Sequence, residues 1–83
     1  MDVEVKVYDA IRSVLEEDSN SHVCSTATFK KDLGFDQLDK YALLMELEEV
    51  FSLRIEDKDF EFIDTVQEAI DYINKRIKEG KKN

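Results

Sequence analysis

Carboxylates are the most frequent groups in this sequence that could bind a partner or take part in chemistry. Between Asp36 and Glu68 there are eleven Asp or Glu residues and three Lys or Arg, whereas residues 74–83 hold five basic residues and one acidic. Within the stretch LGFDQLDKY, residues 33–41, Asp36 can cap a helix and Asp39 places negative charge in its first turn. This acidic middle region predicts binding to partners that present Lys and Arg.

The segment from Asp57 to Glu68 matches a calcium-binding loop only in part. Acidic residues stand at the first, third, fifth and twelfth positions of that template. The sixth position, where the template requires glycine for a sharp turn, is Phe62, and the apolar eighth position is Asp64. An EF-hand is therefore excluded, while weak binding of cations by clustered carboxylates stays open.

His22 and Cys24 are the other residues of metal-ligating type, and they stand close together in the sequence. Two ligands without further Cys or His do not make a metal site. Cys24 also has no basic neighbour fixed in space that would activate its thiol. We therefore expect no metal site, no catalytic pair and no enzyme activity, and we place both side chains in a surface or half-buried loop.

Length and composition indicate one small folded domain over residues 1–83. A chain of 83 residues has room for a single modest core, and its hydrophobic fraction of 42% is too high for disorder on composition alone. The net charge of -8 disfavours binding to nucleic acid and to anionic membranes. The single cysteine, the charged N-terminal stretch and the absence of a membrane-spanning run predict the reducing cytoplasm. We also expect a monomer.

Apolar residues recur at helical spacing in three long segments. The first helix is expected at about 3–17, the second at about 36–51 and the last at about 65–79, with Gly80 as its stop. A short helix is expected at about 57–62. No alternating pattern predicts a strand, so the expected fold is all-α, a four-helix bundle with three long helices and a short one before the last.

The polar segment 18–35 separates the first two helices and is predicted to be a long loop. Loops of this length in small domains are usually functional or partly structured. We expect Phe29 and Leu33 to pin this one to the core.

Two stretches of the chain carry a combination of motifs: FKKDLGFDQLDKYALLMELEEVFSLRI, residues 29–55, and IDTVQEAIDYI, residues 63–73. They resemble the acyl carrier protein family, whose members are small acidic four-helix bundles that carry acyl chains on a 4'-phosphopantetheine arm. Each motif is weak alone, but their combination from Phe29 to Ile73 without a gap is specific. The resemblance implies a carrier in fatty-acid, specialised acyl or polyketide metabolism.

The resemblance implies that 4'-phosphopantetheine is attached at the position of Gln37. In the family, a serine between Asp and Leu forms the phosphodiester link, and here that place reads Asp36, Gln37 and Leu38. A carboxamide has no oxygen that can lose a proton and attack phosphorus. The site is therefore expected to be unloadable in this sequence, with an unchanged fold, because Gln is a good helix former and Asp36 provides the cap.

The resemblance also implies partner-docking residues and an acyl pocket. Partners would be a phosphopantetheinyl transferase and acyl-transferring or condensing enzymes with basic patches. Docking is expected through Asp36, Leu38, Asp39, Met45, Glu46, Glu48 and Glu49. Ala42, where relatives usually carry Glu, and Lys40 are expected to weaken or redirect it. Seven apolar or aromatic residues are expected either to line an acyl pocket or to form only a core in this chain. They are Val7, Ile11, Leu43, Leu47, Ile63, Ala69 and Tyr72.

Two functions stay open at this point. The first is a group carrier in which Gln37 substitutes for the serine of the loadable form. The second is a natural arm-less module that has kept the docking helix and acts as a regulatory or scaffolding partner of acyl-transferring enzymes.

Overall fold

A computed structural model of the chain describes residues 2–15 and 24–80. The helices are α1 (Val3–Leu15), α2 (Gln37–Phe51), α3 (Asp57–Phe60) and α4 (Val66–Gly80). The described part of the chain holds no strand, only an isolated antiparallel bridge between Thr28 and Thr65. The predicted all-α fold with three long helices and a short one before the last is confirmed.

The helix ends differ slightly from those expected. Asp36 is the N-cap of α2 and stands outside its helical residues. The short helix ends at Phe60, because the Ile63 amide donates to the Phe60 carbonyl at 3.1 Å and closes a tight turn over residues 61–62. Residues 16–17, expected at the end of the first helix, and positions 18–23 of the long loop lie outside the described residues.

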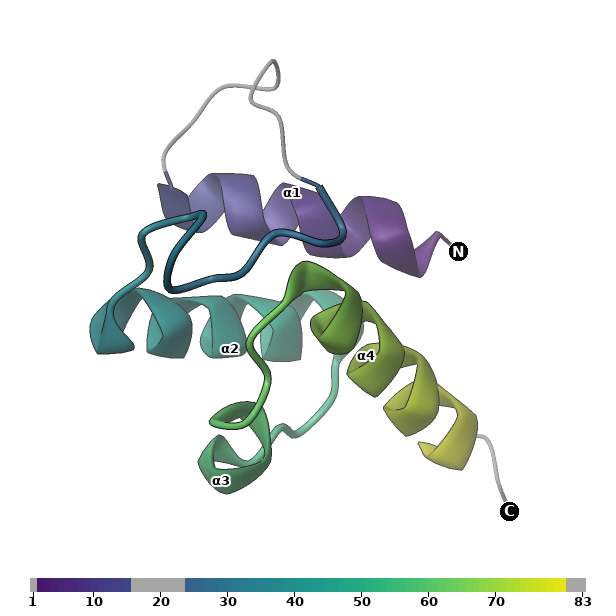
Figure 1. Cartoon of the computed structure of the whole chain (residues 1–83). Coiled ribbons are helices and arrows are strands. Elements are labelled where there is room, and N and C mark those ends of the chain that lie inside the picture. The colour runs from purple at the N-terminus through teal and green to yellow at the C-terminus, as the bar shows by residue number, and fades with distance from the viewer. Residues whose placement is uncertain (1, 16–23, 81–83) are drawn as a thin grey trace.

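The bundle is built around α1 and α2, which lie side by side (Figure 1). α4 starts in front of α2 and runs away from it towards the C-terminus, and its N-terminal part contacts α1. The short α3 lies on the side of α2 that faces away from α1. The described segment before α2 runs between α1 and α2 in this view.

The core is formed by one apolar face of each long helix together with apolar residues of the connectors. Six of the seven expected core or acyl-pocket residues are buried: Val7, Ile11, Leu43, Leu47, Ile63 and Ala69. Tyr72 is half-buried at the edge, where its hydroxyl accepts a hydrogen bond from Arg76 at 2.8 Å and donates to Asp59 at 3.4 Å. Burial of these aliphatic side chains is the main force holding the helices together.

The described part of the loop before α2 is fixed to the start of α4 by backbone hydrogen bonds. The Phe29 amide donates to the Asp64 carbonyl at 2.7 Å, and the Val66 amide donates to the Ala27 carbonyl at 3.0 Å. The Phe29 side chain is 1% exposed, its ring centroid lies 5.3 Å from that of Phe35, and Leu33 packs against the core. Phe29 and Leu33 thus hold this segment as expected.

A reciprocal cap begins α4. The Thr65 hydroxyl accepts a hydrogen bond from the Glu68 amide at 3.1 Å. The Glu68 carboxylate accepts from the Asp64 amide at 2.7 Å and from the Thr65 amide at 3.0 Å. This capping box provides acceptors for backbone N–H groups at the start of the helix, which have no acceptor within the helix itself.

The Glu68 cap predicts a loss of stability in acid. Hydrogen bonds from the Asp64 and Thr65 amides hold the pKa of Glu68 below its ordinary value of 4.5. Because the folded pKa is the lower one, the stabilisation is complete above 4.5 and is lost as the pH falls through the folded pKa. Urea unfolding at stepped pH should show this fall, and Glu68→Gln, which keeps a side-chain acceptor without the charge, should make the fall shallower. An identical acid dependence in the two proteins would contradict a role for this carboxylate.

Candidate functional site at the start of α2

The chain enters α2 through a turn that fixes the backbone before the first helical residue. Gly34 has a φ of 70°, in the left-handed region that favours glycine, and Phe35 is buried. Asp36 accepts a hydrogen bond from the Asp39 amide at 2.8 Å, and the Asp39 carboxylate accepts from the Asp36 amide at 3.2 Å. Because residues 36 and 39 make the cap, the side chain of Gln37 takes no part in it.

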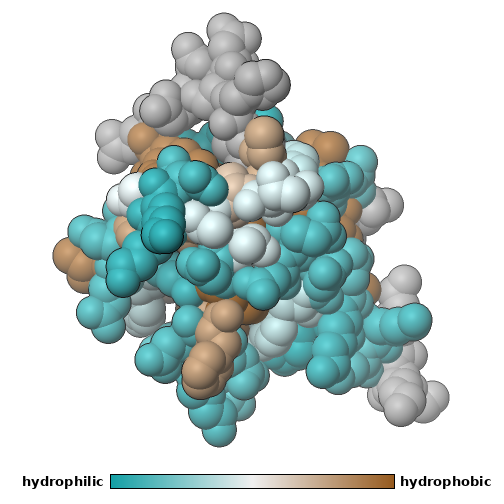
Figure 2. Space-filling model, viewed as in Figure 1, coloured by the Kyte–Doolittle hydropathy of each residue, from teal (hydrophilic) through white to brown (hydrophobic). Residues whose placement is uncertain are grey.

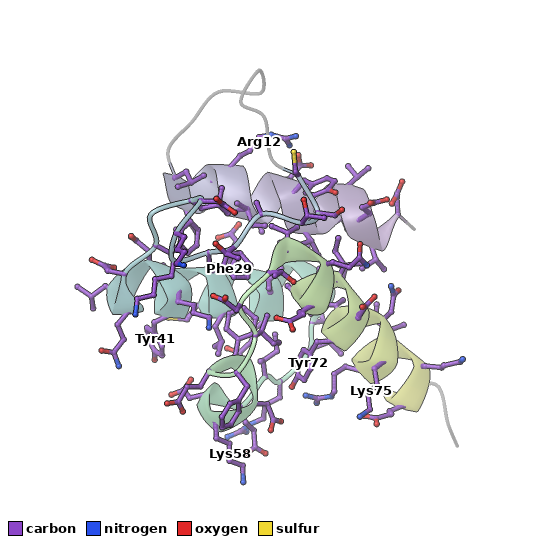
Figure 3. The ribbon with its side chains drawn as sticks, in the orientation of Figure 1. Arg12, Phe29, Tyr41, Lys58, Tyr72 and Lys75 are labelled. Carbon is purple, nitrogen blue, oxygen red and sulfur yellow. The ribbon has the colours of Figure 1, made fainter. Side chains whose placement is uncertain are left out.

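Gln37 is the first residue of α2, and its side chain is exposed. The two hydroxyls nearest in sequence are those of Tyr41 and Thr28. Tyr41 stands one turn further along and projects away from α1, on the side where Lys58 and α3 lie (Figure 3). The Thr28 hydroxyl accepts a hydrogen bond from the Asp32 amide at 3.2 Å. Neither side chain puts a hydroxyl at residue 37 itself.

Some of the expected docking residues are exposed to solvent, and others are half-buried. Leu38 is 77% exposed and Met45 53% exposed, and the carboxylates of Asp36 and Glu49 are on exposed residues. Asp39, Glu46 and Glu48 are half-buried. Glu48 accepts a hydrogen bond from the Ile55 amide at 2.8 Å, so this carboxylate also holds the connector after α2. The face therefore presents apolar side chains between negative charges.

Other candidate groups from the sequence do not assemble into a site in the described residues. The partial calcium-loop segment forms α3, a turn and the first turn of α4, and no group of three or more His, Cys, Asp or Glu side chains could hold a metal ion there. Cys24 is exposed, and His22 lies outside the described residues. None of the helices in the described ranges is long and apolar enough to cross a membrane.

Comparison with known proteins agrees with this geometry. The profile of the phosphopantetheine attachment site family matches residues 5–73. The chain belongs to the acyl carrier protein family. It is 45% identical over 74 residues to an acyl carrier protein of Chlorobium phaeobacteroides, covering 89% of this chain and 94% of the relative. One from Cyanidioschyzon merolae is 40% identical over 73 residues, covering 84% and 80%. The crystal structure of an acyl carrier protein of Thermotoga maritima, 35% identical, superposes with a TM-score of 0.76 and covers 90% of this chain and 86% of that one.

Membership of the acyl carrier protein family answers two of the sequence predictions. Acyl carrier proteins are carriers and not catalysts, so this member of the family is not an enzyme. The group that the family carries is 4'-phosphopantetheine, as expected. Acyl carrier proteins work with phosphopantetheinyl transferases and with acyl-transferring enzymes.

Lys40 has a place in this acyl carrier domain that the sequence did not reveal. Its ammonium group donates to the Glu61 carbonyl at 3.1 Å and lies 5.7 Å from the centroid of the buried Phe60 ring. Burial lowers the pKa of Lys40, against the opposing effect of nearby carboxylates led by Asp64. Lys40 thus links the first turn of α2 to the end of α3, which sequence spacing alone could not indicate.

Proposed function

We propose that this domain acts in fatty-acid, specialised acyl or polyketide metabolism as an arm-less carrier domain. It docks on carrier-recognising enzymes through the start of α2 and takes no phosphopantetheine arm at Gln37, which stands at the family's attachment position. The observation that supports this most directly is an exposed carboxamide at the first residue of a well-capped α2. We place the domain in the cytoplasm as a monomer.

The residues present do not fit an arm attached at residue 37. Phosphopantetheine is transferred from coenzyme A to a side-chain hydroxyl, which loses its proton as its oxygen bonds to phosphorus, while the pyrophosphate bond of coenzyme A breaks and adenosine 3',5'-bisphosphate leaves. The Gln37 carboxamide nitrogen and oxygen have no comparable nucleophilic lone pair, because the amide is conjugated and its proton is far too weakly acidic. With no arm at this position, the buried residues between the helices serve as a core, and nothing delivers an acyl chain to them.

The docking surface, in contrast, keeps the properties that recognition needs. Asp36 and Asp39 stay in place because each caps the other's backbone, and Leu38 and Met45 remain exposed among them. The docking set is Asp36, Leu38, Asp39, Met45, Glu46, Glu48 and Glu49. Partners would present basic patches, so complexes should form quickly at low salt and weaken as salt rises.

The second candidate is a loadable carrier in which only residue 37 has been substituted. The natural arm-less module is favoured because the resemblance implies a second departure from the family, at Ala42, on the same helix. The resemblance implies a Glu at the position of Ala42, and the Lys40 ammonium is engaged with the Glu61 carbonyl and the Phe60 ring.

Competition between matched forms of this chain tests the proposal. The Gln37→Ser variant serves as the substrate of a broad-specificity phosphopantetheinyl transferase with coenzyme A, and the unsubstituted chain is added as inhibitor. We expect competitive inhibition with an inhibition constant close to the KM of the variant, because both present the same docking surface. A control with Asp36 and Glu49 both changed to the corresponding amides should inhibit more weakly. No inhibition at concentrations well above KM would overturn docking on this enzyme.

A further inference from the structure

The short helix α3 cannot hold its conformation by its own hydrogen bonds. It has only four residues, Asp57–Phe60, and a single helical turn is unstable in water because it fixes many torsion angles for few hydrogen bonds. Its N-cap, Glu56, makes no capping hydrogen bond with its side chain in the described structure. Contacts with the rest of the domain must therefore keep α3 in place.

α3 has a polar outer side and one buried aromatic ring. Phe60 is 2% exposed, whereas Asp57, Lys58 and Asp59 are exposed. Figure 2 shows mostly hydrophilic atoms around one brown projection over this part of the molecule. The attachment of α3 to the apolar core thus depends on a single side chain of the helix.

Lys40 adds polar contacts that hold this ring and the end of α3. Its ammonium group donates to the Glu61 carbonyl at 3.1 Å and lies 5.7 Å from the centroid of the Phe60 ring. The last carbonyls of a helix have no donor within the helix, and a lysine side chain can supply one. Lys40 supplies it from the first turn of α2, so α2 caps the C-terminal end of α3.

The same ammonium group also lies near the start of α4. Burial lowers the pKa of Lys40, and the carboxylates of Asp64, Glu61 and Glu68 oppose that change by favouring the charged form. Glu68 belongs to the capping box that begins α4. The other polar contact of α3 with α4, from the Tyr72 hydroxyl to Asp59, is longer at 3.4 Å. Lys40 therefore stands where the start of α2, the end of α3 and the start of α4 meet.

We infer that Lys40 closes the core of this domain to acyl chains, because it fixes α3 and the Phe60 ring over the apolar interior. Without this contact α3 would be the easiest helix to displace, since it is the shortest and buries one side chain. The inference deepens the proposed function and rests on it: a domain without an arm has no acyl chain to shelter. A long apolar chain is the class of ligand that Lys40 would keep out.

Hydrogen exchange in the full chain tests whether Lys40 holds α3. Lys40→Met keeps the apolar stem of the side chain and removes the ammonium group. The amides of Phe60, Glu61 and Ile63, which donate within α3 and the turn after it, should then exchange about tenfold faster or more, as expected for a lost hydrogen bond to a charged group. Lys58→Met is the matched control on α3 itself. Its exposed pair with Glu56, at 3.6 Å, should change these rates by no more than about twofold.

A general loss of stability would give a different pattern of exchange. Val14 packs against the core from α1, and α3 lies on the side of α2 that faces away from α1 (Figure 1). Val14→Ala should therefore lower the free energy of global unfolding without speeding the exchange of the three α3 amides. Equal acceleration by Lys40→Met and Val14→Ala, or no acceleration by Lys40→Met, would overturn the inference.

Binding of dodecanoate, added below its micellar concentration and followed by NMR, tests whether the core is closed. The unsubstituted chain should show no saturable binding, and Lys40→Met should bind at least about tenfold more tightly. Equal behaviour of the two proteins, whether both bind or neither does, would overturn closure by Lys40. The proposed function would stand in that case if the unsubstituted chain inhibits the transferase, whereas absent inhibition with α3 still held by Lys40 would overturn the proposed function alone.

Discussion

Replacing Phe29 by alanine should lower the free energy of unfolding by about 3–5 kcal/mol, which is most of the stability of a domain of this size. The ring is 1% exposed and packs against Phe35 at a centroid distance of 5.3 Å. Its loss leaves a cavity where the segment before α2 meets the core, and it weakens the attachment of that segment to α4 through Asp64. Urea denaturation followed by circular dichroism at 222 nm measures the change.

Phe62→Ala is the matched control for this substitution. The same side chain is removed from a site that is 83% exposed, so stability should change by no more than about 0.5 kcal/mol. Equal destabilisation by the two substitutions would show that Phe29 does not hold the segment before α2 in the way its burial indicates.

Replacing Gln37 by serine should change the chemistry of the domain from no loading to complete loading. The backbone at this position is already fixed by the capping box of Asp36 and Asp39, so the new hydroxyl would stand at the start of an unchanged helix. A phosphopantetheinyl transferase would then find an oxygen nucleophile at the proposed attachment position. Incorporation of a fluorescent coenzyme A analogue, followed over time, measures the gain.

Gln37→Ala is the control for the gain of loading. It leaves the helix start without a hydroxyl, so it should incorporate nothing, and both variants should unfold within about 0.5 kcal/mol of the unsubstituted chain because the position is exposed. A serine variant that folds normally but is not loaded would show that Lys40 or Ala42 already prevents recognition by the transferase.

The long helices and the core could be predicted from the sequence because apolar spacing carries that information directly. The periodicity predicts Leu43 and Leu47 on the apolar side of the second helix, the resemblance implies Ile63 in the core or acyl pocket, and all three are buried. The cap of α2 at Asp36 also followed from the sequence, whereas the hydrogen bond that the Asp39 carboxylate accepts from the Asp36 amide was not predicted, since Asp39 was expected only to place negative charge in the first turn. These features are local, and local sequence determines them.

Features that depend on contacts between distant segments could not be predicted. Lys40 reads as a surface charge, but it reaches the carbonyl of Glu61, twenty-one residues away. Glu48 reads as a docking charge, yet it accepts the Ile55 amide. The exposure of Phe62 was equally hidden, because Phe60 and Ile63 on either side of it are buried and composition does not distinguish the three.

The intact mass of the unsubstituted chain, after incubation with coenzyme A, Mg²⁺ and a broad-specificity phosphopantetheinyl transferase, tests the central claim most directly. The Gln37→Ser variant in a parallel reaction shows that the enzyme is active on this surface. An arm-less domain predicts an unchanged mass for the unsubstituted chain and the addition of one phosphopantetheine group to the variant. A gain of one phosphopantetheine group by the unsubstituted chain would contradict it, because the arm would then be attached at a residue other than Gln37.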